Sequence, residues 1–182
     1  MMIQKIIIPL VLFILVVSCK QDNRFAVTKD RVGPISQTTT VRELATLFAN
    51  DSLVNYEAAT QIKENPSGIT VYEKGRKKLM RLLPKEGNPE STIKNFKLFD
   101  DRYKTEKGIG LNSTFKDING AYTIKRIENL IDVIVIFVDE SEAYFTIDKK
   151  HLASDLMFNT RTTIEKTQIP DDTPLKYFMI EW

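Results

Sequence analysis

Few residues of this sequence could carry out chemistry, and they predict neither a catalytic nor a metal site. The chain has one histidine, His151, and one cysteine, Cys19. Asp148 and Asp155 lie close to His151 in sequence and could form a carboxylate–histidine pair, but no second histidine exists to complete a metal triad. None of the candidate serines, Ser113, Ser141 and Ser154, has the glycine pattern of a nucleophile elbow. We expect a solvated His151, no enzyme activity, no cofactor and no bound metal.

A turn that combines glycines with polar side chains is the second candidate. Gly108-Ile109-Gly110 lacks the third glycine and the lysine-threonine ending of a phosphate loop. A helix start after Thr114 would present free amides to an anion or to a partner's carboxylate. The alternative, which we favour, is that the segment only shapes a strand-to-helix turn. The candidate binding residues are Gly108, Gly110, Asn112, Ser113 and Thr114.

Charged runs give two further possibilities. The basic run of residues 74–78 (KGRKK) could meet lipid phosphates, because lysine and arginine clusters are attracted to anionic surfaces. A solvated hairpin tip is the favoured interpretation. Asp100-Asp101 and Asp171-Asp172 lack the alternating oxygen ligands of a calcium loop, so we expect them in turns.

Cys19 closes a segment with the features of an export signal. Lys5 precedes an apolar run, Ile6 to Val17, whose 12 residues fall short of the roughly 20 needed to span a bilayer. Leu15-Val16-Val17-Ser18-Cys19 resembles a bacterial lipobox, in which the cysteine is lipidated and the chain is cut just before it. We predict a signal peptide over 1–18 and a lipid anchor, of palmitate type, at Cys19. An uncleaved anchor with a chance cysteine is the alternative.

The residue after the cysteine bears on localisation. Lys20 stands where an aspartate would be the usual inner-membrane retention signal in enterobacteria. By that analogy we expect the outer membrane of a Gram-negative cell envelope. No later stretch approaches spanning length, so we expect the remainder to be a soluble domain.

Length and composition indicate one globular domain. The chain has 182 residues, 42% hydrophobic and 27% charged, with a net charge of +2. This near balance excludes nucleic-acid binding by bulk electrostatics, and one cysteine excludes a disulfide framework. Residues 19–31 are polar and without periodicity, as in a flexible tether. We expect a single domain over 32–182.

Local patterns predict an α+β domain with a mostly antiparallel sheet and a few short helices. Thr40 and Glu43 form a capping box before a helix near 41–49. The expected strands are 69–72 and 79–83 around a turn at Gly75, then 93–99, 122–127, 132–138, 143–147 and 175–182. A short turn at 115–118 would be closed by a left-handed Asn119-Gly120, and 154–156 forms a helix or loop. The apolar strand 132–138 is expected at the centre, covered on both faces, one of them by the helix.

A weak internal echo appears at an offset of 74 residues. Each of the two similar segments has a hydrophobic residue, then a threonine helix cap, then a short amphipathic helix followed by about three strands. The physical interpretation is two α-β-β-β units that share a sheet. Chance similarity is the alternative. The aligned residues are Ile35, Thr40, Val41, Arg42, Glu43, Leu44 and Phe48 with Ile109, Thr114, Phe115, Lys116, Asp117, Ile118 and Tyr122.

Four stretches carry a family resemblance. They are 32–35, 93–100 followed by 105–118, the strand near Tyr144-Phe145, and 169–175 leading to a closing 180–182. In order and spacing the chain resembles the enterobacterial lipoprotein family regulated by the envelope-stress (sigma-E) factor, a domain of unknown function. The resemblance implies a location in the cell envelope and an α+β fold. The family has no established catalytic activity, so the resemblance implies no mechanism. Enterobacterial members carry a later cysteine pair that this chain lacks, so no disulfide is implied.

The expected function is therefore non-enzymatic. We expect a membrane-anchored envelope lipoprotein that binds a protein partner or supports the envelope. A small-ligand-binding domain is the alternative, and a hydrolase the third. An apolar pocket with converging polar groups would favour a ligand, whereas an exposed apolar patch would favour a protein partner. The sequence leaves the identity of the partner and the oligomeric state open.

Overall fold

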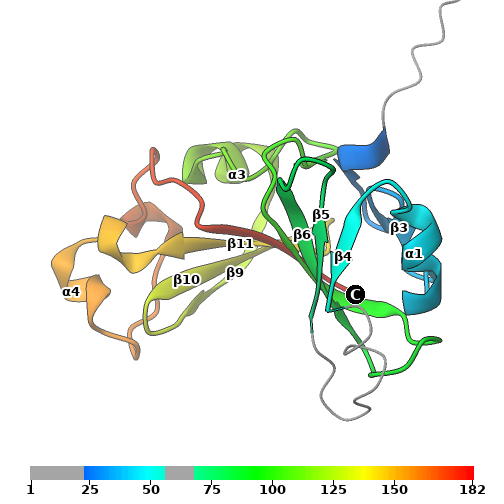
Figure 1. Ribbon diagram of the computed structural model, residues 1–182. Coiled ribbons are helices and arrows are strands. Elements are labelled where there is room, and N and C mark those ends of the chain that lie inside the picture. Colours follow the sequence, from blue (N-terminus) through cyan, green and yellow to red (C-terminus); the bar gives the residue numbers. More distant parts are fainter. Residues whose placement is uncertain (1–22, 56–67) are drawn as a thin grey trace, which may run out of the picture.

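The computed structural model describes residues 23–55 and 68–182 (Figure 1). The predicted signal peptide and Cys19 lie outside these residues. The predicted α+β class is confirmed, with a mostly antiparallel sheet and short helices. No helix in the described part of the chain has the length and apolarity to cross a bilayer.

The N-terminal segment forms a small sheet, in the order β3-β2-β1-β8. Its elements are η1 (Asn23–Phe25), β1 (Ala26–Val27), β2 (Arg31–Val32), β3 (Ile35–Ser36) and β8 (Lys104–Thr105). β1 runs parallel to β8, pairing Val27 with Thr105, and the Val27 side chain is buried. The prediction of a tether up to residue 31 is therefore wrong for residues 23–31, because backbone pairing and burial of Val27 hold this segment in the fold.

The main sheet has eight strands in the order β4-β5-β6-β7-β12-β11-β10-β9, all antiparallel to their neighbours. The first half contains β4 (Ser52–Val54), β5 (Ile69–Tyr72), β6 (Lys78–Pro84) and β7 (Ile93–Leu98). The second contains β9 (Ile124–Asn129), β10 (Val133–Val138), β11 (Ala143–Asp148) and β12 (Tyr177–Glu181). The two halves adjoin at the middle of the sheet, where β7 pairs with β12, the last strand of each half (Figure 1).

Each half begins with a short capped helix. η2 (Val41–Glu43) and α1 (Leu44–Leu47) precede β4, and α3 (Phe115–Ala121) precedes β9. The order helix-β-β-β-β is therefore repeated, with four strands in each unit rather than the expected three. The remaining short helices, η3 (Lys149–His151), α4 (Ser154–Met157) and η4 (Lys166–Gln168), lie between β11 and β12.

Equivalent hydrogen bonds in the two units support the repeat. In each, the first two helical amides donate to carbonyls of the loop that leads into the unit's last strand. The four bonds, all 2.9 Å, run from Val41 to Ser91, Arg42 to Pro89, Phe115 to Thr173 and Lys116 to Asp171. Both caps also follow the predicted capping box, since a carboxylate three residues on accepts the N–H of Thr40 or Thr114 at 2.7 Å. The 74-residue echo thus corresponds to matching local structure.

Two expectations about local elements are wrong. Helix α3 runs through Asn119-Gly120 to Ala121, and the Tyr122 N–H still donates to the Ile118 carbonyl at 2.9 Å. The chain leaves the helix at Tyr122 in an extended conformation, so no left-handed residue closes it. β10 is second from the sheet edge rather than central, because the two units join through β7 and β12.

The cover of β10 also differs from the expectation. Helix α1 lies at the opposite end of the sheet (Figure 1). Ile134 and Ile136 are fully buried on one face, and Val135 is buried on the other. On that second face Phe137 is only half-buried, where it stacks on Tyr144 with ring centroids 5.3 Å apart and carries the Arg126 guanidinium 3.4 Å above its ring.

Burial of β10 predicts a large effect of truncation. Ile134→Ala should lower the free energy of unfolding by about 2–5 kcal/mol, because it leaves a cavity in the core. Ile131→Ala, in the exposed turn just before β10, is the control and should change it by less than about 0.5 kcal/mol. Urea unfolding followed by circular dichroism measures both. Equal midpoints for the two variants would contradict the placement of β10.

The caps give a paired test of the repeat. Thr40→Ala and Thr114→Ala should each lower the free energy of unfolding by about 1 kcal/mol, because each removes the hydroxyl that bonds the capping carboxylate. Denaturant midpoints measure the two effects. A loss at one site alone would show that the two helix starts are not equivalent.

Candidate functional site

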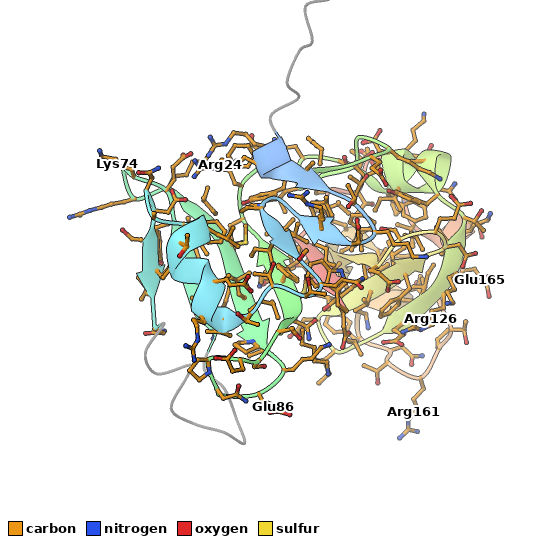
Figure 2. All side chains as sticks on the ribbon, turned by 90° about the vertical axis from the view of Figure 1, so that its right-hand side faces the viewer. Arg24, Lys74, Glu86, Arg126, Arg161 and Glu165 are labelled. Atoms are coloured by element: carbon orange, nitrogen blue, oxygen red, sulfur yellow. The ribbon has the colours of Figure 1, made fainter. Side chains whose placement is uncertain are left out.

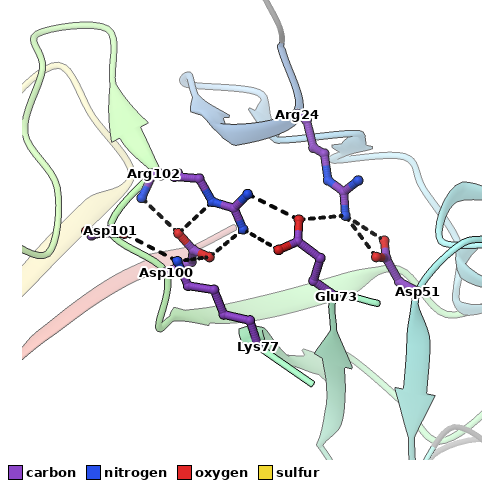
Figure 3. Close-up of polar contacts among 7 residues, drawn as sticks. All are labelled: Arg24, Asp51, Glu73, Lys77, Asp100, Asp101 and Arg102. Carbon is purple, nitrogen blue, oxygen red and sulfur yellow. Dashed lines mark hydrogen bonds and ion pairs between the residues drawn. The ribbon is translucent and has the colours of Figure 1, made fainter. Parts of the chain in front are cut away.

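Seven charged residues gather where the N-terminal segment meets the first unit (Figure 3). Four segments supply them: η1, the residue before β4, the β5–β6 turn, and the loop after β7. We call this group the charged cluster. Its members are Arg24, Asp51, Glu73, Lys77, Asp100, Asp101 and Arg102.

Asp100 is the centre of the charged cluster and is fully buried. Its carboxylate accepts bonds from the backbone N–H and Nε of Arg102, both at 3.0 Å, and from Nη2 at 2.7 Å. The Lys77 ammonium lies 3.0 Å from the same carboxylate. Burial opposes ionisation, but the bonds from Arg102 and Lys77 prevail and hold the pKa of Asp100 well below its ordinary value.

The cluster continues from Arg102 towards the N-terminal segment. The Arg102 guanidinium binds Glu73 through two bonds of 3.1 and 2.8 Å, and these bonds lower the pKa of Glu73. Arg24 binds both oxygens of Asp51, at 2.8 and 3.0 Å, and approaches Glu73 at 3.7 Å. Alternating charges thus join η1 to β4, to the β5–β6 turn and to the loop after β7.

Two aromatic side chains, Phe25 and Tyr103, pack next to the charged cluster. The Phe25 ring lies under the Arg102 guanidinium, 4.0 Å from its centroid, and meets the Tyr103 ring edge-on at 5.1 Å. Burial raises the pKa of Tyr103, whose hydroxyl has no hydrogen-bond partner among the described residues. Gly33 permits this close packing: it has a φ of +57°, and a Cβ there would lie 2.3 Å from the Arg24 carbonyl oxygen.

The charged cluster is suited to holding segments of the chain together through ion pairs. Each carboxylate faces a cation, and Asp100 stays ionised at any ordinary pH, so it is a poor general acid or base. No serine, cysteine or histidine belongs to the cluster. Within residues 23–55 and 68–182, no group of three or more metal-ligating side chains is placed to hold an ion.

The polar groups of the predicted binding turn, Gly108 to Thr114, form hydrogen bonds within the domain. Gly108 adopts a φ of +80°, the Gly110 N–H donates to the Ser113 hydroxyl at 3.2 Å, and Asn112 donates to Asp101 at 3.1 Å. Thr114 caps α3, whose first two amides already donate to Thr173 and Asp171. The amides that the anion hypothesis required are therefore engaged, and the turn serves to position α3.

His151 is exposed in η3 and forms no side-chain hydrogen bond within the described part of the chain. The structure brings none of the three candidate serines into hydrogen-bond contact with it. Asp148 instead binds the backbone of Lys150 and the Lys176 ammonium at 3.1 and 3.0 Å. The carboxylate–histidine pair considered from sequence is therefore not formed.

An exposed apolar surface lies at the β9–β10 turn and α4, at the opposite end of the domain from η1 (Figure 1). Ile131 is 76% exposed and Phe158 86% exposed, with Leu130 beside them. Beneath them, the buried Lys149 ammonium donates to the carbonyls of Leu130 and Asn159, at 3.2 and 3.0 Å, and so fixes the turn to the segment after α4. A hollow of about 610 Å³ is lined by Leu130, Ile131, Val133 and Tyr177, among others.

Comparisons with known proteins show the fold alone. No family model matches the chain, and no curated protein matches it in sequence. The crystal structure of the uncharacterized protein yfeY from Escherichia coli is similar, with a TM-score of 0.53 and 12% identity. The match covers 86% of this chain and 99% of that one. At this identity the likeness extends to the arrangement of strands and helices only.

No pattern in the sequence predicts the charged cluster. Its members lie as far apart as Arg24 and Arg102, and no spacing joins them. Two local signals exist, Asp100-Asp101 directly after a strand and the basic run on the hairpin, but each by itself indicates only a turn. The pairing of β1 with β8, of β4 with β5 and of β6 with β7 brings these segments together.

The central role of Asp100 can be tested with a matched pair of variants. Asp100→Asn should lower the free energy of unfolding by about 1–3 kcal/mol, since it leaves Arg102 and Lys77 without their buried counter-charge. Asp101→Asn is the control, because Asp101 is half exposed, and should change it by less than about 0.5 kcal/mol. Chemical denaturation at pH 7 measures both.

The contribution of Asp100 to the free energy of unfolding should depend on pH. A carboxylate with a lowered pKa stabilises the fold above its unfolded pKa, about 3.9, and loses that contribution as the pH falls. The stability difference between the wild type and Asp100→Asn should therefore be constant above about pH 5 and shrink below about pH 4. A difference that grew on acidification would contradict the ion pairing.

Proposed function

We propose that this protein is a lipid-anchored, non-catalytic protein of the bacterial cell envelope, held at the outer membrane through Cys19. The observation that carries the proposal is the position of this single cysteine. It ends an apolar run of signal-peptide length and precedes the first described residue of the fold, Asn23, by four residues. The sequence resemblance to the envelope-stress lipoprotein family supports the same address.

The short connection constrains how the domain would sit. Four residues span at most about 14 Å, even fully extended. A lipidated Cys19 would therefore keep η1 close to the membrane surface. The far end, with Ile131 and Phe158, would be directed away from it, since η1 and α4 lie at opposite ends of the domain (Figure 1).

Contact with another envelope component is the activity that the surface supports best. Phe158 and Ile131 expose apolar side chains that a soluble domain rarely leaves uncovered together. The second candidate, binding of a small ligand, is favoured by the neighbouring hollow and its apolar lining. Because the exposed Phe158 is not among the residues that line this hollow, a protein partner accounts for more of the surface.

The anchor is tested by changing the cysteine. Cys19→Ser should abolish labelling with radioactive fatty acid and release the protein from the membrane fraction or leave it unprocessed, because only a thiol can form the thioether to lipid. Ser18→Ala keeps a small residue before the cleavage point and should leave labelling unchanged. A mature, unlabelled form that remained in the membrane fraction would contradict the proposal.

A further inference from the structure

We infer that the turn between β5 and β6 docks on anionic lipid headgroups through Lys74 and Arg76. This inference rests on the proposed function, since it concerns the membrane to which Cys19 would be attached. It adds a second, electrostatic contact, which would set the orientation of the domain on the bilayer. The partner is the lipid surface itself, recognised by its phosphate groups.

The first observation is position. Figure 2 shows Lys74 at the same end of the molecule as Arg24, which lies in the first described element, η1. Glu86 and Arg161 lie at the opposite end in the same view. A membrane that held Cys19 would thus face the side of the domain that carries the β5–β6 turn.

The second observation is the distribution of charge within the turn. Glu73 and Lys77, at its two ends, are engaged in the charged cluster. Lys74 and Arg76, between them, are exposed and form no ion pair with any residue of the described chain. The turn therefore presents two unneutralised cations to solvent, while its only carboxylate is held inward by Arg102.

The third observation is that the turn is held in place. The Glu73 N–H donates to the Lys77 carbonyl at 2.8 Å, and the Arg76 N–H donates to the Glu73 carbonyl at 2.9 Å. Gly75 and Arg76 both adopt positive φ, of 106° and 73°. With Lys77 bound to Asp100, the turn is fixed relative to η1, so docking would require little further ordering of the backbone.

The strength of the contact suits an anchored protein. A basic side chain near an anionic surface strengthens binding by about fivefold. Two such residues would be too weak to hold a free protein, but the anchor already confines the turn to the membrane surface and so raises its effective concentration there. Lys74 and Arg76 would set the orientation of the domain, whereas the lipid on Cys19 would attach the protein to the membrane.

Accessibility of lysines in vesicles tests the inference. The mature protein, isolated from bacterial membranes, is reconstituted into phosphatidylcholine vesicles with or without about one third phosphatidylglycerol. A water-soluble acylating reagent then labels exposed amines, and mass spectrometry compares Lys74 with Lys85, the exposed neighbour of Glu86 at the far end. We expect several-fold slower labelling of Lys74 relative to Lys85 in the anionic vesicles only, reversed by about 0.5 M salt.

Matched variants identify the charges involved. Arg76→Gln should weaken the docking equilibrium by about fivefold and so remove most of the protection of Lys74. Arg161→Gln makes the same change of charge at the far end and should leave protection unchanged. Equal effects of the two variants would show that net charge, and not the β5–β6 turn, is responsible, and would overturn the inference.

The two proposals fail in distinguishable ways. If the protein floats with the vesicles but Lys74 and Lys85 are labelled equally in both lipid mixtures, the docking inference is wrong and the anchor stands. If the protein does not float with vesicles of either composition, the proposed anchor is wrong, and the docking inference falls with it.

Discussion

Antiparallel pairing between β7 and β12 joins the two halves of the main sheet, and the rest of the fold depends on it. The pairing sets Phe96 opposite Ile180 and Leu98 opposite Phe178, and all four side chains are buried. Without it, each four-stranded unit would expose the hydrogen-bonding edge of its last strand and the apolar side chains around it. β12 is also the last strand of the second half, so its pairing with β7 closes the open edges of both halves at once.

The two units are alike in topology and differ in what their turns carry. The turn between β5 and β6 is basic, whereas the turn at the same place in the second unit, between β10 and β11, is acidic (Asp139-Glu140-Ser141-Glu142). The basic character is therefore a property of one unit and not a requirement of the fold. The N-terminal sheet and the charged cluster are also built on the first unit and the loop that follows it. The proposed membrane-facing side thus belongs to the half of the molecule closest in sequence to Cys19.

The charged cluster explains how an exposed hairpin can be part of a fixed surface. An isolated surface ion pair contributes little, because water competes for both charges. Here a fully buried Asp100 anchors Arg102 and Lys77, and Arg102 in turn holds Glu73. The chain of pairs reaches Arg24, in η1, the first described element of the chain. The proposed lipid-binding turn is thus fixed relative to η1.

The sequence by itself determined the local structure. Capping boxes at Thr40 and Thr114, the turn at Gly75 and the strand that begins at Ile93 depend on residues a few positions apart, whose bonds form within one turn or one hairpin. Tertiary structure decided which strands became neighbours. It moved the apolar β10 next to the edge, paired β1 and β2 in a small sheet and assembled the charged cluster. These outcomes depend on which surfaces remain to be buried once the whole chain has folded, and the order of residues along the chain does not encode that locally.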